Sequence, residues 1–120
     1  MSHLPTVLIV EDEALIRMTV AEDLTDAGFR MIEAVNADEA LSILEQSTDV
    51  RAIFTDIDMP GSCDGVNLAH IVRRRWPTIE ILMTSGRRWP TSAQLPTGIK
   101  FFPKPYSHDA IISTLMSMIG

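Results

Sequence analysis

Five polar residues in this sequence are of the kinds that could accept and hold a phosphoryl group. They are Glu11, Asp12, Asp56, Thr84 and Lys104. Three carboxylates brought together repel one another unless a cation is bound, and their hard oxygen atoms suit Mg²⁺, which keeps several of its water ligands. Phosphoryl transfer to a carboxylate needs little beyond charge neutralisation and alignment, which one metal ion, one ammonium group and one hydroxyl group can supply. The residue types therefore predict magnesium-assisted phosphoryl transfer, provided that the fold brings them together.

Five short apolar runs have the character of strands and must place these residues. Residues 6–10 are apolar or β-branched throughout, as in a strand that is buried on both faces of a parallel sheet. The same reasoning predicts further strands over residues 29–34, 52–55, 79–83 and 100–102. Each of the five polar residues then follows or ends a strand.

Helical patterns fill most of the gaps between the strands. Asn36 and Ser107 are suitable N-caps, and Gly28 and Pro77 are suitable stops. The apolar positions expected to face the core are Ile16, Val20, Leu24, Ala27, Ala37, Ala40, Leu41, Leu44, Leu68, Val72, Trp76, Ile111, Leu115 and Met118. Four helices are therefore predicted with regular amphipathic patterns.

The segment 85–98 departs from this alternation. It holds Pro90 and Pro96, so a shortened helix or a loop is predicted in place of a regular fourth helix. Strands that alternate with helices otherwise imply right-handed crossovers and a doubly wound, five-stranded parallel sheet, of flavodoxin-like α/β type with order 2-1-3-4-5. Ligands bind beyond the carboxyl ends of such strands, at the point where the order reverses. The polar residues should therefore converge there, since neighbouring strands are about 4.8 Å apart.

Composition limits the class of protein. The 120 residues suffice for one domain, and 46% hydrophobic with 22% charged residues is typical of soluble globular proteins. A net charge of −6 argues against a nucleic-acid surface. Cys63 is the only cysteine, which excludes an internal disulfide, and no stretch could cross a bilayer. We expect a cytoplasmic protein without membrane contact.

The motifs resemble those of the response-regulator receiver family of two-component systems, which includes CheY-like proteins. Glu11-Asp12 follows an apolar strand, Asp56 is followed by Met59-Pro60 and Gly65, and Thr84 and Lys104-Pro105 come later in the same order. The likeness covers essentially the whole chain, so a single receiver domain over residues 1–120 is expected.

The resemblance also implies roles for individual residues. Asp56 would be the phosphoacceptor, and Asp12, Asp56 and the backbone carbonyl of Asp58 would hold Mg²⁺ with support from Glu11. Lys104 would pair with the phosphoryl oxygens, and its bond to Pro105 would be cis. The switch residues would be Thr84, through its hydroxyl group, and Phe101, through its aromatic ring.

Three features depart from the family pattern and bear on the output surface. The loop from Asp56 to Gly65 is one residue longer than the common spacing, Pro90 and Pro96 interrupt the segment expected to be a helix, and Ser85 stands in place of the usual small apolar neighbour of Thr84.

The expected function is phosphorelay signalling rather than enzymatic turnover. A histidine kinase or phosphotransfer protein would supply the phosphoryl group, because none of the three histidines of the chain looks like a donor. The chain ends at Gly120, directly after the last predicted helix, so output through contact with a downstream protein is expected. The sequence leaves a homodimer open.

Two other classes of protein deserve comparison. Asp56-Ile57-Asp58 resembles the nucleophile motif of haloacid-dehalogenase-type phosphatases, but in that family the metal-binding acids come late in the chain and a cap encloses the substrate. A flavodoxin-like cofactor carrier needs a phosphate-binding loop after the first strand, where Glu11-Asp12-Glu13 would repel phosphate.

Overall fold

The structure, a computed structural model, describes residues 4–47, 49–59, 64–86 and 94–119. In these residues the elements follow one another as β1 (Thr6–Val10), α1 (Ala14–Asp26), β2 (Arg30–Ala34), α2 (Ala37–Gln46), β3 (Val50–Asp56), α3 (Gly65–Arg75), β4 (Glu80–Ser85), β5 (Lys100–Pro103) and α4 (His108–Ile119). The strands form a five-stranded parallel sheet in the order β2-β1-β3-β4-β5. The predicted fold class and strand order are thus confirmed.

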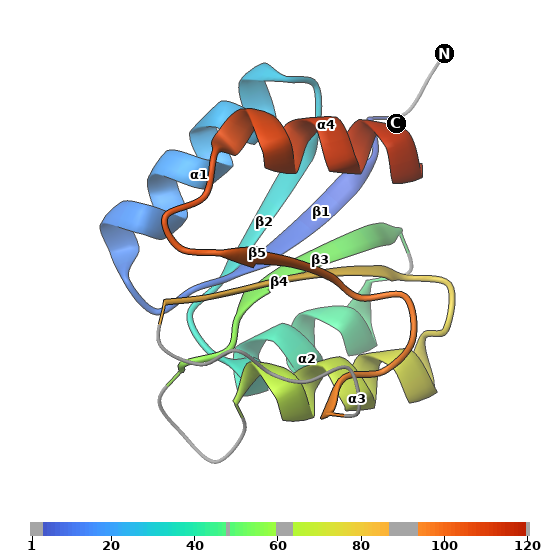
Figure 1. The fold of residues 1–120 in the computed structure, drawn as a ribbon. Coiled ribbons are helices and arrows are strands. Elements are labelled where there is room, and N and C mark those ends of the chain that lie inside the picture. Colours follow the sequence, from blue (N-terminus) through green and yellow to red (C-terminus); the bar gives the residue numbers. More distant parts are fainter. Residues whose placement is uncertain (1–3, 48, 60–63, 87–93, 120) are drawn as a thin grey trace.

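Helices cover both faces of this sheet (Figure 1). The helices α1 and α4 lie on one face, and α2 and α3 lie on the other. Each face has its own apolar core: Val20 and Leu24 of α1 pack with Ile111 and Leu115 of α4, whereas the second core includes residues of α2 and α3. The strand β1, which lies between β2 and β3, is buried along its whole length. This packing fixes the carboxyl edge of the sheet, where the polar residues were expected.

The predicted helix boundaries are explained by local hydrogen bonds. The Asn36 side chain accepts a hydrogen bond of 2.8 Å from the Glu39 backbone N–H, and Ser107 Oγ accepts one of 3.3 Å from Ala110 N–H. After α1, Gly28 has a φ of +106°, a conformation that glycine adopts without strain. These caps and this turn were visible in the sequence.

Some strand ends differ from the prediction. The strand β3 begins two residues earlier than expected, at Val50, and β4 continues through Thr84 to Ser85. Apolar periodicity misses such ends because the deciding contact is the ladder to the neighbouring strand: Asp56 pairs with Thr84, and Ser85 with Pro103. The expected cis bond between Lys104 and Pro105 is present.

The irregular segment between β4 and β5 is described only in part. Residues 87–93, which include Pro90, lie outside the described residues, so the prediction for them stays a prediction. The described residues 94–98 contain no α-helix. Within the described ranges, no helix is both long and apolar enough to cross a membrane.

A test of the fold concerns Gly65, which packs against the end of β3. A Cβ atom there would lie 2.2 Å from the Asp56 carbonyl oxygen and 2.7 Å from Ile57 Cα. We predict that Gly65→Ala lowers the free energy of unfolding by about 1–3 kcal/mol, because backbone atoms must move to admit the methyl group. Urea unfolding would measure this, with Gly86→Ala as the control, whose Cβ would meet Lys104 Cδ at an ordinary 3.5 Å. Equal losses in the two variants would contradict the close approach.

Candidate phosphoacceptor site

The predicted site residues come together at the carboxyl edge of the sheet. One open pocket of about 480 Å³ is lined by Glu11, Asp12, Glu13, Asp56, Asp58, Gly86 and Lys104. Thr84 lines a small adjoining cavity that it shares with Glu11 and Asp56. Parallel strands end at the same edge, which is why residues from distant parts of the chain meet here.

Asp56 lies at the centre of this arrangement, and both of its carboxylate oxygens have partners. Its Oδ2 atom accepts a hydrogen bond of 2.6 Å from Lys104 Nζ, and its Oδ1 atom accepts one of 3.0 Å from Asp58 N–H. The residue is only 4% exposed. A buried carboxylate of this kind requires a charged partner, and Lys104 provides it.

Glu11 is as deeply buried as Asp56 and faces the same lysine. Its Oε2 atom accepts a hydrogen bond of 3.0 Å from Glu13 N–H, and its Oε1 atom lies 3.8 Å from Lys104 Nζ. Its backbone carbonyl accepts a 3.0 Å hydrogen bond from Arg17 Nη1. Arg17 also pairs with Glu33 on β2 at 3.1 Å. The loop after β1 is therefore held by a hydrogen bond within it, between Glu11 and Glu13, and by Arg17, which links it to β2.

The crowding of charge shifts two pKa values. Burial, followed by the charge of Asp56, raises the pKa of Glu11 to about 7 from its ordinary value of 4.5. Burial alone would lower the pKa of Lys104, but the hydrogen bond and charge of Asp56, with smaller contributions from Glu11 and Asp58, raise it. The residues that line the pocket carry five carboxyl groups and a single lysine ammonium group, so acidic groups outnumber basic ones there.

The two expected switch residues lie on adjacent strands. Thr84 Oγ1 is buried and, in the described part of the chain, has no hydrogen-bond partner. Phe101 is half-buried at the end of the sheet and packs against the core that faces α2 and α3. An unpartnered buried hydroxyl group is unusual enough to require an explanation.

The residues present fit a hard divalent cation. The pocket is lined by the carboxylate-bearing residues Glu11, Asp12, Asp56 and Asp58, whose oxygen atoms are hard ligands of the kind that such a cation prefers. Within the described ranges, no three acidic, histidine or cysteine side chains are already placed as a metal-binding group. A cation that keeps several waters does not require such a cage.

Sequence reasoning missed the contributions of three residues. Arg17 holds the carbonyl of Glu11, and Ser85 donates a hydrogen bond of 2.8 Å to Asp58 Oδ2. Tyr106 packs edge-on against Phe54 beside the site, and burial raises its pKa to about 12. Arg17 and Tyr106 carry no signal in a single sequence, whereas Ser85 was noticed only as a departure from the family pattern.

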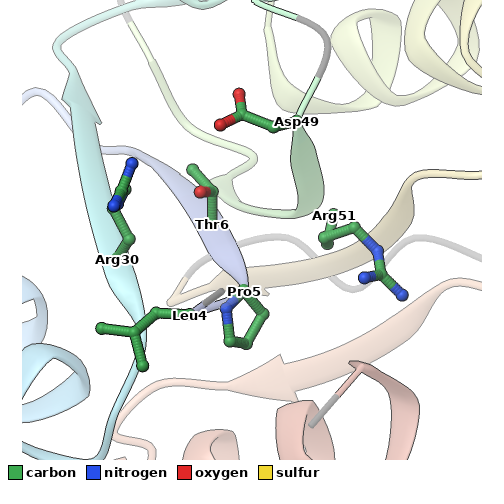
Figure 2. A pocket seen from close by; sticks show the side chains of 6 residues that line it. All are labelled: Leu4, Pro5, Thr6, Arg30, Asp49 and Arg51. Carbon is green, nitrogen blue, oxygen red and sulfur yellow. The ribbon is translucent and has the colours of Figure 1, made fainter. Parts of the chain in front are cut away.

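A second pocket, of about 380 Å³, lies at the opposite edge of the sheet (Figure 2). It is lined by Leu4, Pro5, Thr6, Arg30, Asp49 and Arg51, all at the amino ends of β1, β2 and β3. None of the predicted site residues reaches it, so it is separate from the acidic pocket.

The fold and the pocket define a flavodoxin-like α/β protein with an acidic site where the strand order reverses. Residues 7–115 match the family model of the response regulator receiver domain. The chain therefore belongs to this family, whose members act in phosphorelay signal transduction.

Individual relatives agree with this assignment. The NtrX-like response regulator of Rickettsia felis is 34% identical over 115 residues, which are 91% of this chain and 24% of that protein. The sensor kinase CckA of Brucella abortus is 35% identical over 118 residues, 95% of this chain and 12% of that protein. The chain thus spans a quarter or less of these relatives. A receiver protein from Sinorhizobium medicae has the same fold, with a TM-score of 0.88 at 24% identity over 97% of this chain and 94% of that one.

The raised pKa of Glu11 predicts a specific dependence of stability on pH. The folded state binds the Glu11 proton more tightly than the unfolded chain does. The stabilisation that the protonated Glu11 side chain gives to the folded state is therefore full below pH 4.5 and is lost as the pH rises to about 7. The loss is at most about 3 kcal/mol, at 1.36 kcal/mol for each pKa unit. The Glu11→Gln variant should therefore gain stability relative to the parent chain between these pH values.

Urea unfolding from pH 4 to pH 8, without divalent cations, would measure this difference. The exposed Glu22 on α1 supplies the control, since Glu22→Gln removes a carboxylate that lies outside the acidic pocket. A pH-independent difference for Glu11→Gln would contradict the effect of burial on this carboxyl group.

Proposed function

We propose that Asp56 accepts a phosphoryl group from a phosphohistidine of a histidine kinase or phosphotransfer protein. The observation that carries the proposal is the 2.6 Å contact between Asp56 Oδ2 and Lys104 Nζ in an acidic pocket that opens to solvent. In the transfer, a carboxylate oxygen of Asp56 forms a bond to phosphorus as the bond from phosphorus to the donor imidazole nitrogen breaks. The electron pair of that bond stays on the imidazole.

The other site residues prepare Asp56 for this step. Lys104 neutralises charge on the phosphoryl oxygens while remaining close to the carboxylate. Asp12, Asp56 and the carbonyl of Asp58 would hold Mg²⁺, with Glu11 in support. When bound, the metal ion supplies charge neutralisation and alignment of the phosphoryl oxygens. Asp58 N–H, which donates to Asp56 Oδ1, leaves the other oxygen to Lys104.

The response to phosphorylation is proposed to begin at Thr84. Among the described residues its Oγ1 atom, buried beside Asp56, has no hydrogen-bond partner, so a phosphoryl group with strong acceptor oxygens would give it one. A shift of Thr84 toward Asp56 leaves space that Phe101 can fill from the neighbouring strand. Of the segment between these two residues, the described part, residues 94–98, would then rearrange.

A groove beside the acidic pocket is where we place the phosphodonor. It has a volume of about 530 Å³ and shares Gly86 and Lys104 with the acidic pocket. Its α1 wall includes Leu15, which is 74% exposed. A donor protein must bring its imidazole to Asp56 close to this groove, so contact with the groove would orient the donor.

Downstream proteins, in the cytoplasm, are proposed to read the structural change that phosphorylation causes near Phe101. We propose no contact of this domain with nucleic acid or a membrane.

The chain is proposed to act as a stoichiometric phosphoacceptor and not as an enzyme. The comparisons give no support to the haloacid-dehalogenase alternative, and the acids Glu11 and Asp12 come first in the chain. The two functions differ in stoichiometry: a receiver takes up one phosphoryl group per chain, whereas a phosphatase turns over a phosphomonoester continuously.

The assignment of Asp56 is tested by labelling with a small phosphodonor and Mg²⁺. The parent chain is expected to gain one phosphoryl group in mass spectrometry, and Asp56→Asn is expected to gain none because the amide is not a nucleophile here. Asp49→Asn, at the opposite edge of the sheet, is the control and should label like the parent. Equal labelling of Asp56→Asn and the parent would refute the proposed site.

The switch is tested by amide hydrogen exchange with and without a beryllium fluoride mimic of the phosphoryl group. In the parent, the largest change is expected between Thr84 and Phe102, because that part of the chain joins the two switch residues. Thr84→Ala should bind the mimic and lose most of this change. An unchanged exchange pattern in the parent would rule out the proposed switch.

A further inference from the structure

Ser85 joins two of the loops that form the acidic pocket. It is the last residue of β4 and is 1% exposed. Its Oγ atom donates a 2.8 Å hydrogen bond to Asp58 Oδ2 in the loop after β3. Its carbonyl oxygen accepts a 3.0 Å hydrogen bond from Lys104 N–H after β5. A small apolar residue at this position could make the second contact but not the first.

The contact with Ser85 holds Asp58 at a second point. The backbone N–H of Asp58 already donates to Asp56 Oδ1 at 3.0 Å. With its side chain bound to β4 as well, residue 58 is fixed between two strand ends. Nearby, Gly65 N–H donates to Ile57 O at 3.0 Å and fixes the far end of the same loop. The peptide group that follows Asp58, which includes the Asp58 carbonyl, is therefore held in place before any ligand binds.

We infer that Ser85 is a positioning residue for the cation site: its hydrogen bond to the Asp58 side chain preorganises the backbone of residue 58 for Mg²⁺. This inference rests on the proposed function. A loop that is already ordered loses less conformational entropy when a ligand binds. Partners of metal-binding groups typically contribute 10- to 100-fold to metal affinity, so loss of the Ser85 hydroxyl should weaken Mg²⁺ binding about tenfold.

The experiment is an Mg²⁺ titration by calorimetry on the full chain and on five variants of residues 58 and 85. Ser85→Ala removes the donor, and Asp58→Ala removes the acceptor. Asp58→Asn removes the charge of residue 58 but keeps an oxygen that can accept the bond. Ser85→Ala is then added to each of the two Asp58 variants, because the effect of a lost contact depends on whether its partner is present.

The inference predicts that Ser85→Ala weakens Mg²⁺ binding about tenfold in the parent and in the Asp58→Asn chain. It predicts no further loss in the Asp58→Ala chain, which has no acceptor. Hydrogen exchange of the Asp58 amide, measured without metal, should be faster in Ser85→Ala than in the parent. If Ser85→Ala does not fold, a comparison of Asp58→Ala with Asp58→Asn still decides the question, since only Asp58→Ala should lose the tether.

Two results would overturn the inference and leave the proposed function intact. One is equal Mg²⁺ affinity in the parent and Ser85→Ala, and the other is an equal loss in Asp58→Ala and Asp58→Asn, which would assign the effect to charge. Failure of the parent itself to bind Mg²⁺ would overturn the proposed function together with the inference. Asp12→Ala serves as the reference for loss of the metal site.

Discussion

The structure depends on the concentration of negative charge at one edge of a parallel sheet. Glu11 and Asp56 are both about 4% exposed, and Lys104 reaches both of them. Burial of charge without a partner is costly, so the fold tolerates this pocket only with the lysine in place. Burial, followed by the charge of Asp56, still raises the pKa of Glu11, so keeping this carboxylate ionised has a cost in the folded chain.

The rest of the fold holds the acidic pocket in place. Two apolar cores pack against the two faces of the sheet, and separate contacts hold the loops that carry the acids. Arg17 holds the loop after β1 through the carbonyl of Glu11, and Gly65 closes the loop after β3 against its backbone. The loops that carry the acids are therefore held by contacts that lie outside the pocket itself.

The end of β4 places two hydroxyl side chains, those of Thr84 and Ser85, at the acidic pocket. Thr84 and Ser85 are adjacent, so their side chains leave the strand in different directions. Thr84 lies beside Asp56, and its hydroxyl group has no hydrogen-bond partner among the described residues, whereas the hydroxyl group of Ser85 donates to Asp58. One short strand end thus carries two hydroxyl groups in different environments.

The sequence by itself determined the fold and most of the site. Continuous apolar strands, the Asn36 cap and the stop at Gly28 are local signals, and alternation of strands with helices permits few topologies. From that topology, Asp12, Asp56 and Lys104 had to meet at one edge. Only the tertiary structure decided the hydrogen bond of Ser85 to Asp58, that of Arg17 to the Glu11 carbonyl and the burial of the Thr84 hydroxyl group beside Asp56. These depend on distances between side chains from different strands and loops, which periodicity along the chain does not encode.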